Sequence, residues 1–167
     1  MRNFISIIFV ASLLITAPLS FDLNAQAGTQ KNQNDDMKQK YRKARVLQTS
    51  TAKKITKVVE ALERVNEEGK EDPDWVTVRA ILNELLANKD ELKSYDRSVM
   101  WNYWGYVYFS DEDYDSAMYA YEQLLQEPEA TIPLRTASLF TVAQLYMVKG
   151  NFKKAIDYIL RWMDEVE

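Results

Sequence analysis

The sequence predicts an all-α protein made of antiparallel helical hairpins, and its composition and an internal repeat carry that prediction. The 167 residues include only four Gly and four Pro, while Ala, Leu, Glu and Lys occur throughout. Ala, Leu, Glu and Lys favour helices, whereas Gly and Pro interrupt them. Residues 98–125 also align with residues 136–163 without a gap, at an offset of 38 positions. Each copy carries two apolar stripes at helical spacing around a short polar turn, which predicts a two-helix hairpin.

The two copies match in side-chain size as well as in spacing. The small residues Gly105 and Ala117 of the first copy correspond to Ala143 and Ala155 of the second. We expect them to lie where the two helices of a hairpin cross, because small side chains let backbones approach while large neighbours fill the gaps. The large matched pairs are Trp101 with Leu139, Trp104 with Val142, Tyr108 with Tyr146, Tyr114 with Phe152, and Tyr121 with Ile159.

Residues 1–27 are predicted to be a signal peptide. Arg2 precedes an uncharged apolar run at residues 4–17, and small residues before Gly28 predict cleavage after Ala27. The alternative is an uncleaved anchor, although the fourteen apolar residues are fewer than a spanning helix needs. Because no Cys follows the run for lipid attachment, export into a bacterial periplasm is the preferred interpretation. The polar residues 28–37 lack apolar periodicity and are expected to form a flexible leader.

Residues 38–94 are expected to hold a basic helix followed by a degenerate helical hairpin. Between residues 38 and 57 the chain is rich in Lys and Arg. One interpretation is a solvated helix face, with Lys stems lying along the next helix. The other is contact with an acidic partner or with an anionic membrane surface, which stays open as an alternative.

The degenerate hairpin is predicted from apolar spacing on both sides of a polar connector. Gly69 is expected to end its first helix as a C-cap. The second helix is expected to begin at a cap formed by Asp72 or Asp74 and to end near Asn88. The apolar residues that predict these helices are Ile55, Val58, Val59, Leu62 and Val65 for the first, and Trp75, Val78, Ile81, Leu82, Leu85 and Leu86 for the second.

Residues 95–167 are expected to contain the two clear hairpins. Ser94 or Asp96 is the expected cap at the start of the first one. The turns are expected at residues 110–112 and around Gly150, because Gly takes the left-handed conformation that ends many helices.

The composition argues against catalysis and against nucleic-acid binding. The net charge of −4 provides no basic field for nucleic acid. The chain has neither His nor Cys, which removes thiol catalysis, Ser-His-Asp chemistry and Cys/His zinc sites. The acids between Asp111 and Asp115 lie at a predicted turn and helix start, where they stabilise the helix dipole. They lack the Gly and the bidentate Glu of a calcium loop, so we expect a non-catalytic protein without a cofactor or a metal site.

Each copy resembles the tetratricopeptide repeat, whose large, small and aromatic positions follow the same order. The resemblance implies a right-handed α-solenoid of about three antiparallel hairpins, in which the first helix of each hairpin lines a concave groove for a peptide or a helix. The alternative for the aromatic groove residues is that they pack between repeats as core. The groove positions that the resemblance implies are Asn102, Tyr106, Phe109, Phe140, Gln144 and Met147, with Val99 and Ala137 beside them.

A narrower resemblance concerns exported tetratricopeptide proteins encoded beside TonB–ExbB-type energy-transducing systems of Gram-negative bacteria. It rests on the segment Tyr95-Asp96-Arg97 and on residues 139–146, which read Leu-Phe-Thr-Val-Ala-Gln-Leu-Tyr. Those relatives are usually longer, with further repeats. The resemblance implies a periplasmic scaffold that holds a peptide or helix of an envelope protein, for example of a TonB-type transport complex.

The predicted last helix is apolar beyond one narrow stripe, whereas a terminal repeat ordinarily has a polar outer face. Three interpretations stay open: the helix forms a homodimer, a partner covers it, or the chain is a shortened relative of longer arrays. The alternative function is therefore a structural module that associates with itself. The residues expected at that contact are Ile159, Leu160, Met163 and Val166.

Overall fold

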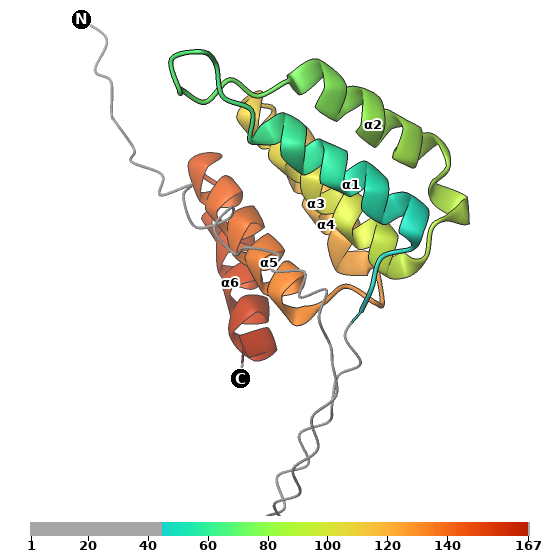
Figure 1. Cartoon of the computed structure of the whole chain (residues 1–167). Coiled ribbons are helices and arrows are strands. Elements are labelled where there is room, and N and C mark those ends of the chain that lie inside the picture. The colour runs from blue at the N-terminus through green and yellow to red at the C-terminus, as the bar shows by residue number, and fades with distance from the viewer. Residues whose placement is uncertain (1–44, 167) are drawn as a thin grey trace, which may run out of the picture. The chain divides into compact units, whose positions relative to one another are not determined.

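The computed structural model describes residues 45–166, and every regular element in that part of the chain is a helix (Figure 1). The elements are α1 (Thr49–Leu62), α2 (Trp75–Ala87), the short 3₁₀ helix η2 (Lys89–Glu91), α3 (Ser94–Ser110), α4 (Tyr114–Gln126), α5 (Ile132–Val148) and α6 (Phe152–Val166). The all-α prediction is thereby confirmed for the described residues. The predicted signal peptide, the leader and the start of the basic segment lie outside them.

The α-helices pair as three successive hairpins, α1–α2, α3–α4 and α5–α6. Between hairpins, α2 packs against α3, α4 packs against α5, and α3 also touches α5. Among the described residues, neither helix of the first hairpin packs to a comparable extent against α5 or α6. The contacts therefore follow the order of the hairpins along the chain, as expected for stacked hairpins. None of the described helices has the length and apolar character that crossing a membrane requires.

Helix α1 begins where the degenerate hairpin was predicted to begin and ends earlier than predicted. It runs from Thr49 to Leu62. Val65 is more than half exposed and forms an isolated bridge, and Gly69 turns the connector with φ +73°. The predictions that Val65 belongs to the buried face and that Gly69 caps the helix are therefore wrong. The reason is that the Asn66 side chain accepts the N–H groups of the following loop, which offers the backbone an alternative to the helix.

Helix α2 begins at one of its two predicted caps. The carboxylate of Asp74 accepts the N–H of Thr77 at 3.0 Å, which satisfies one of the unpaired donors at the helix start. Hydrogen bonding with Thr77 lowers the pKa of the Asp74 carboxyl. Val78 and Leu82 are buried as predicted. The helix ends at Ala87, directly before the predicted end.

The start of α3 differs from the prediction, because neither predicted residue caps the helix. The Ser94 hydroxyl instead accepts the N–H of Glu129, at 3.0 Å, from the connector that precedes α5. Asp96 is fully buried, and its Oδ1 accepts the backbone N–H of Gln48 at 3.0 Å, just before α1 begins. Asp96 therefore ties the first hairpin to the second. No local sequence pattern signals a hydrogen bond to a residue so distant in the chain.

An ion pair recurs at the repeat offset in the second and third hairpins. In the second, the guanidinium of Arg97 donates to both carboxylate oxygens of Glu127 at 2.7 and 2.8 Å. In the third, Arg135 donates to both oxygens of Glu165 at 2.8 and 3.0 Å. Each pair joins the first turn of one helix to the end of its hairpin partner. The 38-residue repeat of the sequence is thus also a repeat of the structure.

The two hairpin turns also correspond. Gly150 has φ +72°, as predicted for a residue that ends a helix in the left-handed region. Glu112 stands at the same position of the preceding hairpin and has φ +59°. A side chain disfavours that conformation, whereas Gly adopts it without strain. The α3–α4 turn therefore carries backbone strain at Glu112, whereas the α5–α6 turn forms the same geometry without strain at Gly150.

The predicted helix crossings are confirmed. Ala117 and Ala143 are fully buried, and Ala155 nearly so. A Cβ atom added to Gly105 would lie 2.6 Å from ring carbons of Tyr121, so α3 and α4 approach closely only because residue 105 has no side chain.

Candidate interaction surface

The groove positions of α3 are half-buried rather than open. The rings of Tyr106 and Trp75 lie 6.0 Å apart, and those of Phe109 and Tyr114 lie 5.9 Å apart. Phe109 also packs against the core cluster between the second and third hairpins. Both aromatic residues therefore pack between elements, as the alternative interpretation proposed, and each keeps part of its surface accessible. Asn102 beside them is also half-buried.

Val99 does not face a groove. Only 7% of its surface is exposed, and it belongs to the main core cluster together with residues of α1 and α2. The prediction for this residue is wrong because the first hairpin covers that face of α3, which the repeat alignment alone does not show.

The corresponding positions of α5 are more open. Phe140 is 41% exposed and Met147 is 53% exposed, while Gln144 between them and the neighbouring Ala137 are half-buried. Phe140 keeps one ring neighbour, Trp162 of α6, at a centroid distance of 5.6 Å. The accessible apolar part of the predicted groove therefore lies on α5, with an amide group between two apolar side chains.

The outer side of α6 is a second exposed apolar surface. The predicted contact residues Leu160, Met163 and Val166 are about half exposed, and Ile159 is half-buried. Phe152 and Ile156, which the prediction left out, are still more exposed. We define the α6 stripe as these six apolar residues: Phe152, Ile156, Ile159, Leu160, Met163 and Val166.

The equivalent positions of α4 in the preceding hairpin identify the role of the α6 stripe. Met118 and Leu125 of α4 stand 38 positions before Ile156 and Met163. The α4 residues are only 6% and 9% exposed, whereas Ile156 and Met163 are 58% and 46% exposed. The α4 residues pack against apolar residues of α5. The α6 stripe is therefore the hairpin-stacking face, uncovered within the described residues.

A polar network that the sequence did not predict holds α4, α5 and α6 together. The hydroxyl of Tyr158 donates to Glu122 Oε1 at 2.7 Å, and the hydroxyl of Tyr146 donates to the same oxygen at 3.3 Å. Burial, and then the hydrogen bond to Glu122, raise the pKa of Tyr158, so the phenol keeps its proton as a donor. Lys154 and Arg161 lie over the rings of Tyr146 and Tyr158 respectively. An acid with two tyrosine partners on two other helices has no signature in the repeat alignment.

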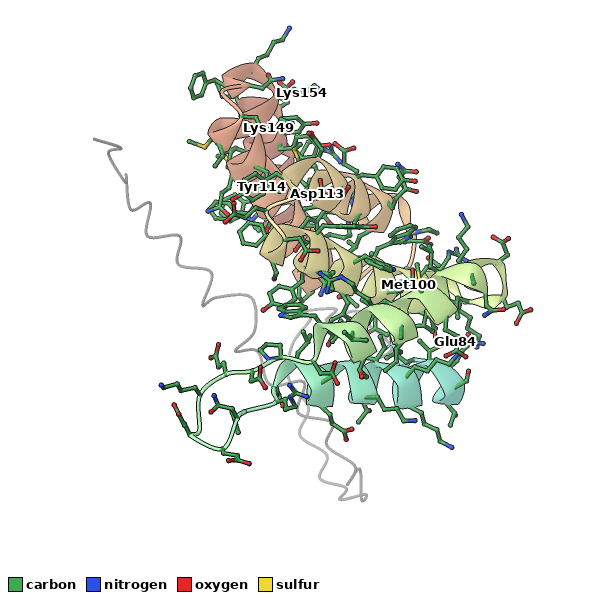
Figure 2. All side chains as sticks on the ribbon, turned by 90° about the horizontal axis from the view of Figure 1, so that it is seen from above. Glu84, Met100, Asp113, Tyr114, Lys149 and Lys154 are labelled. Atoms are coloured by element: carbon green, nitrogen blue, oxygen red, sulfur yellow. The ribbon has the colours of Figure 1, made fainter. Side chains whose placement is uncertain are left out.

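The acids of the α3–α4 turn take part in contacts between hairpins. Asp111 receives two hydrogen bonds from Arg79 of α2, and Asp115 pairs with Lys149 at the α5–α6 turn. Asp113 caps α4 by accepting the N–H of Ser116, and Figure 2 shows Lys149 beside this helix start. Asp111 and Asp115 therefore link neighbouring hairpins, whereas Asp113 caps a helix within its own hairpin.

The described part of the basic segment is engaged in ion pairs as well as exposed to solvent. Arg45 pairs with Glu129 at 3.3 Å, and Lys54 pairs with Glu84 of α2 at 2.8 Å. Lys53 and Lys57 are exposed. Within the residues that the structure describes, no group of acids is arranged to hold a metal ion.

Comparison of the chain with protein-family models, with curated proteins and with solved structures gave no match. The interpretation of both apolar surfaces therefore rests on the residues that form them.

Proposed function

We propose that this chain is a non-catalytic scaffold of the tetratricopeptide type, a right-handed stack of hairpins that holds a peptide or a helix of another protein. The binding surface that we assign is the α5 part of the predicted groove, formed by Phe140, Gln144 and Met147. Asn102 and the accessible edges of Tyr106 and Phe109 extend it along α3.

The observation that carries this proposal is the difference in exposure between the two copies of the groove. Tyr106 and Phe109 are half-buried, whereas Met147 is 53% exposed and Phe140 is 41% exposed beside its ring neighbour Trp162. Exposed apolar side chains around an amide suit a partner with apolar anchors and a backbone group for the amide. Because the helix backbone is already ordered, binding restricts only the side chains of these residues.

The location and partner class that we propose come from the sequence. The N-terminal 27 residues support export to a periplasm with cleavage after Ala27. The resemblance to exported tetratricopeptide proteins beside TonB–ExbB-type systems supports an envelope protein as the partner. Phe140 and Gln144 belong to the segment that carries this resemblance, residues 139–146.

The experiment has two steps. A photo-crosslinking amino acid at Gln144 identifies the partner in a Gram-negative host, and binding of the identified segment to the purified protein is then measured. Phe140→Ser combined with Met147→Ser should weaken that binding at least about tenfold, because central apolar anchors dominate small interfaces. The matched control is Val76→Ser, since Val76 is 81% exposed on α2, away from this surface.

The control variant should bind like the wild type. Equal binding by the wild type and by the double variant, with circular dichroism showing that both are folded, would refute the α5 surface. A protein recovered from the cytoplasm with its first 27 residues still attached would refute the proposed location.

A further inference from the structure

Helix α6 carries two apolar faces, and only one of them packs inward. Ala155 is buried, and Tyr158 and Trp162 are half-buried against α4 and α5. With 3.6 residues per turn, the α6 stripe covers a separate arc of about 120°. Five of its six side chains are between 46% and 63% exposed. An exposed, continuous apolar stripe of this kind marks a contact with another molecule.

We propose that a second copy of this chain covers the α6 stripe, with the two α6 helices antiparallel about a two-fold axis. The surface differs from the one assigned above to the scaffold's partner. The positions of Lys153 and Asp164 on α6 select the second copy and its direction.

Two charged residues flank the α6 stripe on the same edge, at opposite ends of the helix. Lys153 lies in the first turn and Asp164 in the last, and their directions differ by only about 20° around the axis. Neither residue is in an ion pair with another described residue. A cation at the start of a helix and an acid at its end both oppose the helix dipole. Contacts within α6 therefore do not explain this distribution of charge.

An antiparallel partner helix explains the positions of Lys153 and Asp164. A two-fold axis midway between Tyr158 and Ile159 places Lys153 of each copy opposite Asp164 of the other, which gives two ion pairs. The same axis places Ile156 at the height between Leu160 and Met163 of the second copy, so the apolar side chains interdigitate. In a parallel two-fold pair, the edges that carry Lys153 and Asp164 would lie on opposite sides of the contact, so neither ion pair would form.

The opposite end of the stack does not offer a complement to the α6 stripe. The exposed side of α1 carries Lys53, Thr56, Lys57 and Glu60, which are polar. Head-to-tail stacking would bury these residues against apolar side chains at a cost. Pairing of α6 with α6 buries apolar surface on both copies, and an isologous contact of this kind closes at two subunits.

The test is sedimentation velocity on the protein expressed from its full-length gene, with charge-swap variants. Wild type should be a dimer at about 10 µM, and Lys153→Asp should raise the dissociation constant about tenfold, as two symmetric ion pairs are replaced by repulsion. Asp164→Lys should do the same. The double swap Lys153→Asp with Asp164→Lys should restore the dissociation constant to within about threefold of wild type.

Ile156→Ser with Met163→Ser should abolish the dimer while leaving the helix content unchanged, because both side chains are exposed. A wild type that stays monomeric at about 100 µM would overturn the proposal. A double swap that fails to restore the dimer would overturn the antiparallel arrangement. The double swap leaves α5 intact, and Phe140→Ser with Met147→Ser leaves the α6 stripe intact, so failure of this proposal and failure of the scaffold function are distinguishable.

Discussion

Replacing Gly105 by Ala should destabilise the protein, although Ala is the better helix former. Gly105 lies inside α3 at the crossing with α4, and an added Cβ would stand 2.6 Å from two ring carbons of Tyr121. Contacts this short do not occur between relaxed atoms, so the ring or the helix has to shift. Tyr121 is only 3% exposed, so its ring has little space to move into.

The magnitude follows from two opposing effects. Replacing Gly by Ala inside a helix contributes about 1 kcal/mol of stability through helix propensity. Overpacking of a filled site typically costs about 1–3 kcal/mol. The short contacts involve the ring itself rather than the end of a flexible chain, so we expect the upper part of that range. The net loss of unfolding free energy should be about 1–2 kcal/mol.

Urea denaturation followed by circular dichroism measures this loss, and the third hairpin supplies the control. There Ala143 stands at the position of Gly105, and Ile159 stands at the position of Tyr121. Gly105→Ala combined with Tyr121→Ile recreates that pair in the second hairpin. The combination should cost less than the sum of the two single changes by at least about 1 kcal/mol, because the two residues touch.

A gain of stability in Gly105→Ala would refute the reasoning, since it would show that the helices separate without cost. Additive effects of the two substitutions would also refute it. Either result would mean that the close approach of α3 and α4 does not depend on the missing side chain.

Four further outcomes follow from the turns, the ion pairs and the helix caps. Glu112→Gly should stabilise the protein by about 0.5–1 kcal/mol in urea denaturation, because it relieves the left-handed strain, whereas Gly150→Ala should destabilise it. Arg97→Gln should cost about 1–3 kcal/mol, because it leaves a largely buried carboxylate without its partner. The hydrogen bonds at the helix starts lower the pKa of Asp74 and Asp113 below 3.8. These caps therefore contribute stability above about pH 4, and the urea midpoint should fall as the pH drops through their folded pKa.

The sequence predicted the fold wherever neighbouring residues decide the structure. The apolar spacing located α3 to α6, and the matched small residues at 105, 117, 143 and 155 located both helix crossings. Asp74 was one of two predicted caps, and Gly150 takes the predicted turn conformation. Each of these features depends on residues within one hairpin, so local patterns contain the information.

Contacts between distant residues account for what the sequence did not predict. Asp96 looks like a local cap but binds the backbone at Gln48. Gly69 looks like a helix end, but Asn66 organises a loop before it. The groove positions show the same limit, because Val99 meets the groove pattern and is nevertheless covered by the first hairpin. A periodic pattern gives the face of a helix on which a residue lies, and the neighbouring element decides what covers that face.

The difference between a periodic pattern and the element that covers it also explains the exposed apolar face of α6. Met118 and Ile156 occupy equivalent positions and have the same apolar character, yet one is 6% exposed and the other 58%. If Ile156 were only a solvent-facing residue, a polar side chain there would cost the isolated chain nothing. Ile156 and Met163 keep the apolar character of Met118 and Leu125, which are buried in the preceding hairpin. Together with Lys153 and Asp164, placed against the dipole of their own helix, they fit a second α6 helix running in the opposite direction.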